Sequence, residues 1–211
     1  MTAPRGSAAH KRATRSVALG FRAHTGWAVM VVMAGPPSSP CVAHRCRIEL
    51  GGSGVPRFVY HAAREAGLAK APRIVRLART TARRAATQAM REAVAGLAAG
   101  GLKVVAGGVL TGSMSVPKAL GAILASHPLL HAAEGELFRD ALIAGCKACG
   151  IRLRGVPERE LWTRAEQRLG LKRAVLQRRL DELGRVAGRP WAQDQKLAAL
   201  TAWLALDPTD R

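Results

Sequence analysis

Residues 20–28 read GFRAHTGWA, a polar break between two short apolar runs. The first run, residues 16–21, reads SVALGF, and the second, residues 27–33, is rich in valine. Two apolar runs separated by a few turn-forming residues are typical of an antiparallel β-hairpin. The sequence therefore predicts a hairpin near the start of the chain.

Beyond this hairpin the pattern alternates between strands and helices. We expect a third strand at residues 46–50, followed by a helix at 73–99, a strand at 102–110, a helix at 134–150, a strand at 151–156, a helix at 158–183 broken near Gly170, and a helix at 192–206. The order β-β-β-α-β-α-β-α predicts an α/β fold with a mixed sheet and helices on both faces. One domain is expected over residues 16–206, with a disordered basic tail at 1–15 and a short C-terminal tail at 207–211.

The composition is strongly basic. The 211 residues include 33 Lys and Arg against 14 Asp and Glu, which gives a net charge of +19. Such a surplus attracts polyanions, among which nucleic acid is the commonest partner and an anionic membrane surface the next, although a plain composition bias explains it too. The longest apolar run, residues 27–34, is far shorter than the ~20 residues that span a bilayer. Four cysteines are too sparse for a disulfide scaffold. We expect a soluble, cytoplasmic protein.

Two segments together suggest a family. The hairpin segment GFRAHTGWA resembles the first hairpin of the RNase H-like superfamily, and of Holliday-junction resolvases of the RuvC type in particular. Residues 191–196, WAQDQK, are similar to the start of the last resolvase helix. The resemblance implies the RNase H-like fold and a two-metal nuclease site. It also implies that Asp194 stands where these enzymes have a metal ligand.

Most of the catalytic carboxylates that the resemblance implies are absent. Arg22 stands at the position of the first carboxylate on strand one, where it is better suited to receiving a phosphate or pairing with Asp194. Residues 104–109, VVAGGV, contain no acid at the fourth strand, whereas two-metal cleavage needs several converging acids. Glu134 and Glu136 are possible replacements, although acids at a helix start are also explained by the helix dipole. Mg²⁺ is expected only if the chain is a nuclease.

A histidine pair precedes the predicted helix at 134–150. His127, His131 and Glu134 have a spacing that can bind Zn²⁺, but Pro128 is expected to break the helix between the two histidines. Structural packing is the alternative. We expect His131 to lie near Arg22, His24 and Asp194, at one edge of the sheet. The candidate catalytic residues are Asp194, Glu134, Glu136 and His131.

The cysteines form two pairs in the sequence, Cys41 with Cys46 and Cys146 with Cys149. Two such pairs can make a zinc site. The second pair falls in a predicted helix, and free thiols are the simpler interpretation.

Arginines recur at helical spacing along residues 73–91. Such a stripe can follow a phosphate backbone, or it can be an ordinary solvated helix face. The chain has a single tyrosine, and aromatic residues do not alternate with these basic residues. Stacking of aromatic side chains on nucleobases is therefore not indicated. The candidate nucleic-acid-binding residues are Arg73, Arg76, Arg79, Arg83, Arg91, Arg22 and Lys196.

Three functional hypotheses follow. The first is an RNase H-like protein without two-metal nuclease activity that binds nucleic acid or a protein partner. The second is a divergent resolvase-like nuclease that uses Asp194 with Glu134 or Glu136. The third is an interaction module whose basic charge is incidental.

Overall fold

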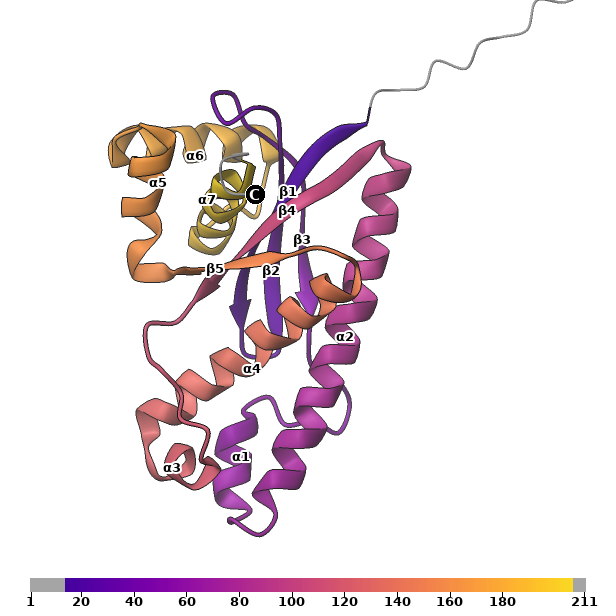
Figure 1. The fold of residues 1–211 in the computed structure, drawn as a ribbon, viewed down its shortest axis with the longest axis vertical. Helices are drawn as coiled ribbons and strands as arrows, with labels where there is room; N and C mark the ends of the chain where they lie inside the picture. Colours follow the sequence, from indigo (N-terminus) through magenta and orange to yellow (C-terminus); the bar gives the residue numbers. More distant parts are fainter. Residues whose placement is uncertain (1–13, 207–211) are drawn as a thin grey trace, which may run out of the picture.

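The computed structural model describes residues 14–206. Its centre is a five-stranded sheet in the order β3-β2-β1-β4-β5 (Figure 1). The strands are β1 (Arg15–His24), β2 (Trp27–Ala34), β3 (Cys41–Glu49), β4 (Leu102–Thr111) and β5 (Leu153–Pro157). β1, β2 and β3 form an antiparallel meander, and β4 runs parallel to both β1 and β5. The predicted α/β architecture and the predicted hairpin are confirmed.

Helices cover both faces of the sheet. One face carries α1 (Val59–Glu65), α2 (Ala71–Ala99), α3 (Leu120–Ala125) and α4 (His127–Ala148). The other carries the 3-10 turn η1 (Glu158–Glu160), α5 (Leu161–Leu169), α6 (Arg173–Ala187) and α7 (Gln193–Leu206). Within residues 14–206, every helix is too short or too polar to span a bilayer. The predicted tails at 1–15 and 207–211 fall almost wholly outside the described residues, except that Arg15 already begins β1.

The two-residue period of β1 assigns its side chains to the two faces. Val17, Leu19 and Phe21 pack into the core under α2 and α4, whereas Ala18 packs into the core under α7. Arg22 therefore projects on the same face as Ala18 and Gly20, toward α7. A Cβ on Gly20 would lie 1.9 Å from the carbonyl oxygen of Ala198, so only glycine allows α7 to approach β1 this closely.

Helix α4 differs from the sequence-based expectation. It begins at His127, seven residues before the predicted start, and Pro128 lies in its first turn. Proline is compatible with that position because the first N–H groups of a helix have no partner within the helix. The expected helix break between His127 and His131 is therefore wrong. Both histidines stand on one continuous helix.

Two further elements also differ from the sequence-based expectation. Helix α1 forms within a stretch rich in proline and glycine, and β3 begins at Cys41 rather than at residue 46. The buried face of α2 consists of Ala71, Val75, Ala78, Ala82, Ala86, Met90 and Leu97. Alanines lie on every side of this helix, so the sequence pattern defines its buried face poorly. Close packing against α4 determines which face of α2 is buried, since a Cβ on Gly145 of α4 would lie 2.8 Å from the backbone of Ala86.

Candidate functional site

An ion-pair cluster lies where β1 ends. Arg22 comes from β1, Glu158 directly follows β5, and Asp194 lies in the first turn of α7. The Nε of Arg22 is 2.8 Å from Oδ1 of Asp194, and an Arg22 terminal nitrogen donates a hydrogen bond of 2.8 Å to Oε1 of Glu158. We call Arg22, His24, Glu158 and Asp194 the Arg22 cluster. Arg22 and Asp194 form the ion pair that the sequence indicated.

His24 completes the cluster on the other side of Asp194. Its Nε2 lies 3.0 Å from Oδ2 of Asp194, and its ring stacks on Trp27 with the ring centroids 4.1 Å apart. The Arg47 guanidinium lies over the same indole, 4.0 Å from its centroid. Neither Arg22 Nε nor His24 Nε2 is aligned with Asp194 as a hydrogen bond. The Asp194 carboxylate thus lies between the Arg22 guanidinium and the His24 imidazole.

The cluster contains fewer acids than a pair of divalent cations needs. On β4, Leu110 follows the residue paired with Phe21 and packs into the core on the α7 face, which is the face of Arg22, so β4 (LKVVAGGVLT) supplies no carboxylate there. Glu158 is an acid at this edge that the sequence reasoning missed. Its position after the predicted strand at 151–156 could have indicated it. Functional groups of α/β sheets gather at the carboxyl ends of parallel strands.

Glu134 and Glu136 do not join Asp194. Glu134 is 2% exposed, and its Oε1 accepts a 2.7 Å hydrogen bond from the backbone N–H of Tyr60 on α1. Burial raises the pKa of Glu134 above its usual range. Glu136 instead lines a groove beside α2. The two glutamates therefore lie in different places, and neither belongs to the Arg22 cluster.

The groove beside α2 has a volume of about 590 Å³. Arg76, Arg79, Arg83 and Lys118 line it together with the acidic Glu136 and Asp140, and we call it the α2 groove. Arg79 also donates a 3.1 Å hydrogen bond to the hydroxyl of Tyr60. Arg73 and Arg91 are exposed on the same helix. The structure thus brings three of the predicted arginines to one groove.

The other basic candidates are placed apart from this groove. Arg22 belongs to the ion-pair cluster described above. Lys196 lies 2.6 Å from Oδ1 of Asp181 on α6, so its ammonium group already has a carboxylate partner.

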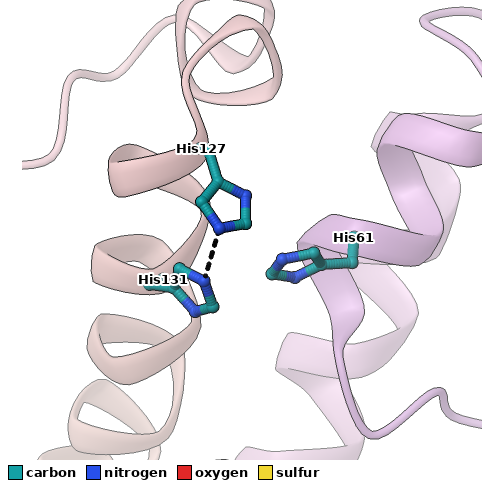
Figure 2. A group of neighbouring side chains, drawn as sticks. All are labelled: His61, His127 and His131. Carbon is teal, nitrogen blue, oxygen red and sulfur yellow. Dashed lines mark hydrogen bonds between the residues drawn. The ribbon is translucent and has the colours of Figure 1, made fainter.

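Three histidines meet near the start of α4. His127 and His131 lie one turn apart on that helix, and His61 reaches them from α1 (Figure 2). The Nε2 atoms of His127 and His131 are 3.2 Å apart. His61 was missed because it is 66 residues away from His127 in the sequence and lies on the unpredicted helix α1. Glu134 is not part of this group, but its Oε1 lies 3.4 Å from Nδ1 of His61.

The expected position of His131 beside Arg22 is wrong. His131 stands on α4, which covers one face of the sheet, whereas Arg22 projects toward α7 on the other face. The early start of α4 turns His131 toward His61, and their ring centroids are 5.0 Å apart. The histidines and the Arg22 cluster are therefore two separate sites.

All four cysteines are free thiols. Cys41 and Cys46 lie on β3, whereas Cys146 and Cys149 lie at the end of α4. Burial raises the pKa of Cys146 to about 12, which disfavours the thiolate form that binds metals. Among residues 14–206, the side chains that gather closely enough to hold a metal ion are the three histidines.

Comparison with known proteins supports the fold assignment. No protein-family model matches the sequence, and neither does any curated protein. Among solved structures, RuvC of Thermus thermophilus matches with a TM-score of 0.52 and 10% identity, over 89% of this chain and 92% of RuvC. Thermus thermophilus RuvC in complex with a Holliday junction substrate matches with a TM-score of 0.55 and 9% identity, over 89% and 91% of the two chains. The chain therefore has an RNase H-like fold similar to that of the resolvase RuvC.

Proposed function

We propose that this protein binds nucleic acid on a resolvase-like scaffold and does not cut it by two-metal chemistry. The observation that carries the proposal is the Arg22 cluster. A guanidinium occupies the centre of the edge where such scaffolds hold cations, and it lies 2.8 Å from both Asp194 and Glu158. A permanently charged arginine supplies there the positive charge that metal ions would otherwise provide.

The basic surface supports nucleic acid as the partner. Arg76, Arg79 and Arg83 stand side by side in the α2 groove, and the chain as a whole carries a net charge of +19. Phosphate contacts by arginines give affinity without sequence preference. One solved structure of similar fold contains a Holliday junction substrate, so branched DNA is the first substrate to test.

The test measures how binding to a four-way DNA junction and to plain duplex depends on salt. The logarithm of the affinity should fall linearly with the logarithm of the salt concentration. Changing Arg76, Arg79 and Arg83 together to alanine should weaken binding and flatten that slope by roughly one unit for each of these arginines that neutralises a phosphate in the wild type. The measurement is fluorescence anisotropy of labelled DNA at several salt concentrations.

A charge-matched triple variant provides the control. Lys172, Arg178 and Arg185 are exposed on and just before α6, on the opposite face of the sheet. Their change to alanine removes the same charge but should keep the wild-type slope. If the Arg76, Arg79 and Arg83 triple variant is indistinguishable from the wild type, or if binding ignores salt, then the basic charge is incidental and an interaction module without nucleic acid is favoured. The cytoplasmic location expected from the sequence stays a prediction.

A further inference from the structure

His61, His127 and His131 form a compact group of imidazoles from two helices. Their candidate ligand atoms all lie within 4.8 Å of one another, and two of them are 3.2 Å apart (Figure 2). A tetrahedral zinc site with Zn–N bonds of about 2.0–2.1 Å places its nitrogens about 3.3 Å apart. The pair on α4 already has this spacing. The His61 nitrogen lies within 4.8 Å of both, so it has to move closer to them to complete such a site.

Glu134 gives His61 the orientation that a metal ligand needs. Oε1 of Glu134 lies 3.4 Å from Nδ1 of His61 and also accepts the hydrogen bond from Tyr60. A carboxylate beside one ring nitrogen holds the proton there and leaves the lone pair of the other nitrogen free for a metal. Figure 2 shows the His61 ring directed toward the two histidines of α4. Histidine ligands of metals commonly have a carboxylate behind them in this way.

The surroundings of Glu134 also favour a nearby cation. Its second oxygen, Oε2, is buried and has no hydrogen-bond partner in the described part of the chain. A buried carboxylate is costly unless positive charge lies close to it. A divalent ion held by His61 would supply that charge through one imidazole ring.

The histidine group also leaves a coordination position open. His127 and His131 are exposed, and a cavity of about 520 Å³ adjoins His61 and His131. Arg57, Phe58 and Glu65 line this cavity. Water or an anionic ligand can therefore reach a fourth position on the ion. Three histidines with an accessible fourth position are an arrangement typical of zinc sites that bind a ligand.

We propose that the Nε2 atom of His61 and one ring nitrogen each of His127 and His131 bind a divalent transition-metal ion, with Zn²⁺ the best match to three imidazoles. Glu134 is the positioning residue. The site lies on α1 and α4, apart from the Arg22 cluster, so it holds whether or not the chain binds nucleic acid. The ion would also tie α1 to α4.

The test uses the untagged full chain, first treated with a chelator, and titrates it with Zn²⁺ by calorimetry and with Co²⁺ by absorption spectroscopy. One ion should bind per chain. Co²⁺ should give the visible bands of a tetrahedral ion without the near-ultraviolet charge-transfer band that thiolate ligands produce. His61→Ala and His131→Ala should each abolish this one-to-one binding, whereas His44→Ala, an exposed histidine on β3, should bind as the wild type does.

Glu134→Gln separates a positioning role from a purely structural one. It should retain one ion per chain but weaken its affinity by about 10–100-fold, because a carboxamide orients the imidazole less strongly. Thermal unfolding without metal verifies that each variant is folded. A thiolate spectrum, or zinc binding that survives His61→Ala, would overturn the proposal, and so would a folded wild type that binds no zinc.

Discussion

At the residue scale, single side chains decide what each site is able to do. Arg22 is on the α7 face because every second residue of β1 points that way, and its arrival beside Asp194 follows from that period. That part of the site was accessible to sequence reasoning, as the expected pairing of Arg22 with Asp194 shows. The His61 contact was not accessible, because no local pattern links a residue on α1 with a pair on α4.

Glu134 gives a prediction about pH. Burial raises its pKa in the folded protein, so the folded state holds this proton at pH values where the unfolded chain has released it. The contribution of Glu134 to the free energy of unfolding is therefore fully present below the ordinary pKa of glutamate and is lost as the pH rises through the raised value. In metal-free protein, Glu134→Gln should flatten this fall. Urea unfolding of both proteins at a series of pH values, with a chelator present, measures the difference. Parallel curves for the two proteins would contradict the prediction.

At the element scale, close contacts between helices and strands set the geometry of the sites. Helix α7 is buried at every position from Leu197 to Leu206, and it approaches β1 over Gly20. This approach places Asp194, in the first turn of α7, beside Arg22. The sequence predicted α7 well because a fully apolar helix is a clear pattern. It did not predict the first turn of α4, because Pro128 indicates a helix start as readily as a helix break.

Two glycine-to-alanine changes test this packing. Gly20→Ala would place a Cβ 1.9 Å from a backbone oxygen of α7, so it should lower the free energy of unfolding by about 1–3 kcal/mol or more. Gly96→Ala on α2 is the matched variant, since a Cβ there would meet nothing within 4 Å. It should raise stability by about 0.5–1 kcal/mol, because alanine favours helix more than glycine does. Denaturant unfolding measures both, and a Gly20→Ala protein as stable as the wild type would refute the close approach.

At the scale of the whole molecule, the order of the strands and helices was predictable from the sequence. Which side chains of neighbouring helices come together was not. The alternation of strands and helices indicated an RNase H-like sheet, which the solved structures of similar fold support. The α2 groove depends on how α2 packs against α4, and alanines on every side of α2 left that packing undetermined. Long-range packing therefore decided which arginines share a groove with Glu136 and Asp140.

The charges gathered at the Arg22 edge of the sheet also determine whether the protein cleaves nucleic acid. A divalent ion about 4 Å from the Arg22 guanidinium would be repelled by several kcal/mol, even at an effective dielectric constant of about 20. Two such ions need several carboxylates, whereas this edge offers Asp194 and Glu158 already paired with Arg22. We therefore expect no cleavage of four-way DNA junctions or RNA–DNA hybrids by the wild type with Mg²⁺ or Mn²⁺. Arg22→Asp, which adds a third acid and removes the cation, should gain Mg²⁺ binding.

Gel analysis of labelled substrates measures cleavage, and calorimetric titration with Mg²⁺ separately measures metal binding. Arg152→Asp makes the same change of charge at an exposed residue just before β5, so it should bind no more Mg²⁺ than the wild type does. Mg²⁺ is chosen because it prefers oxygen ligands, and the three histidines therefore do not compete for it. Metal-dependent cleavage by the wild type that disappears in Asp194→Asn would show that Arg22 does not exclude the metals, and the chain would then be a divergent nuclease.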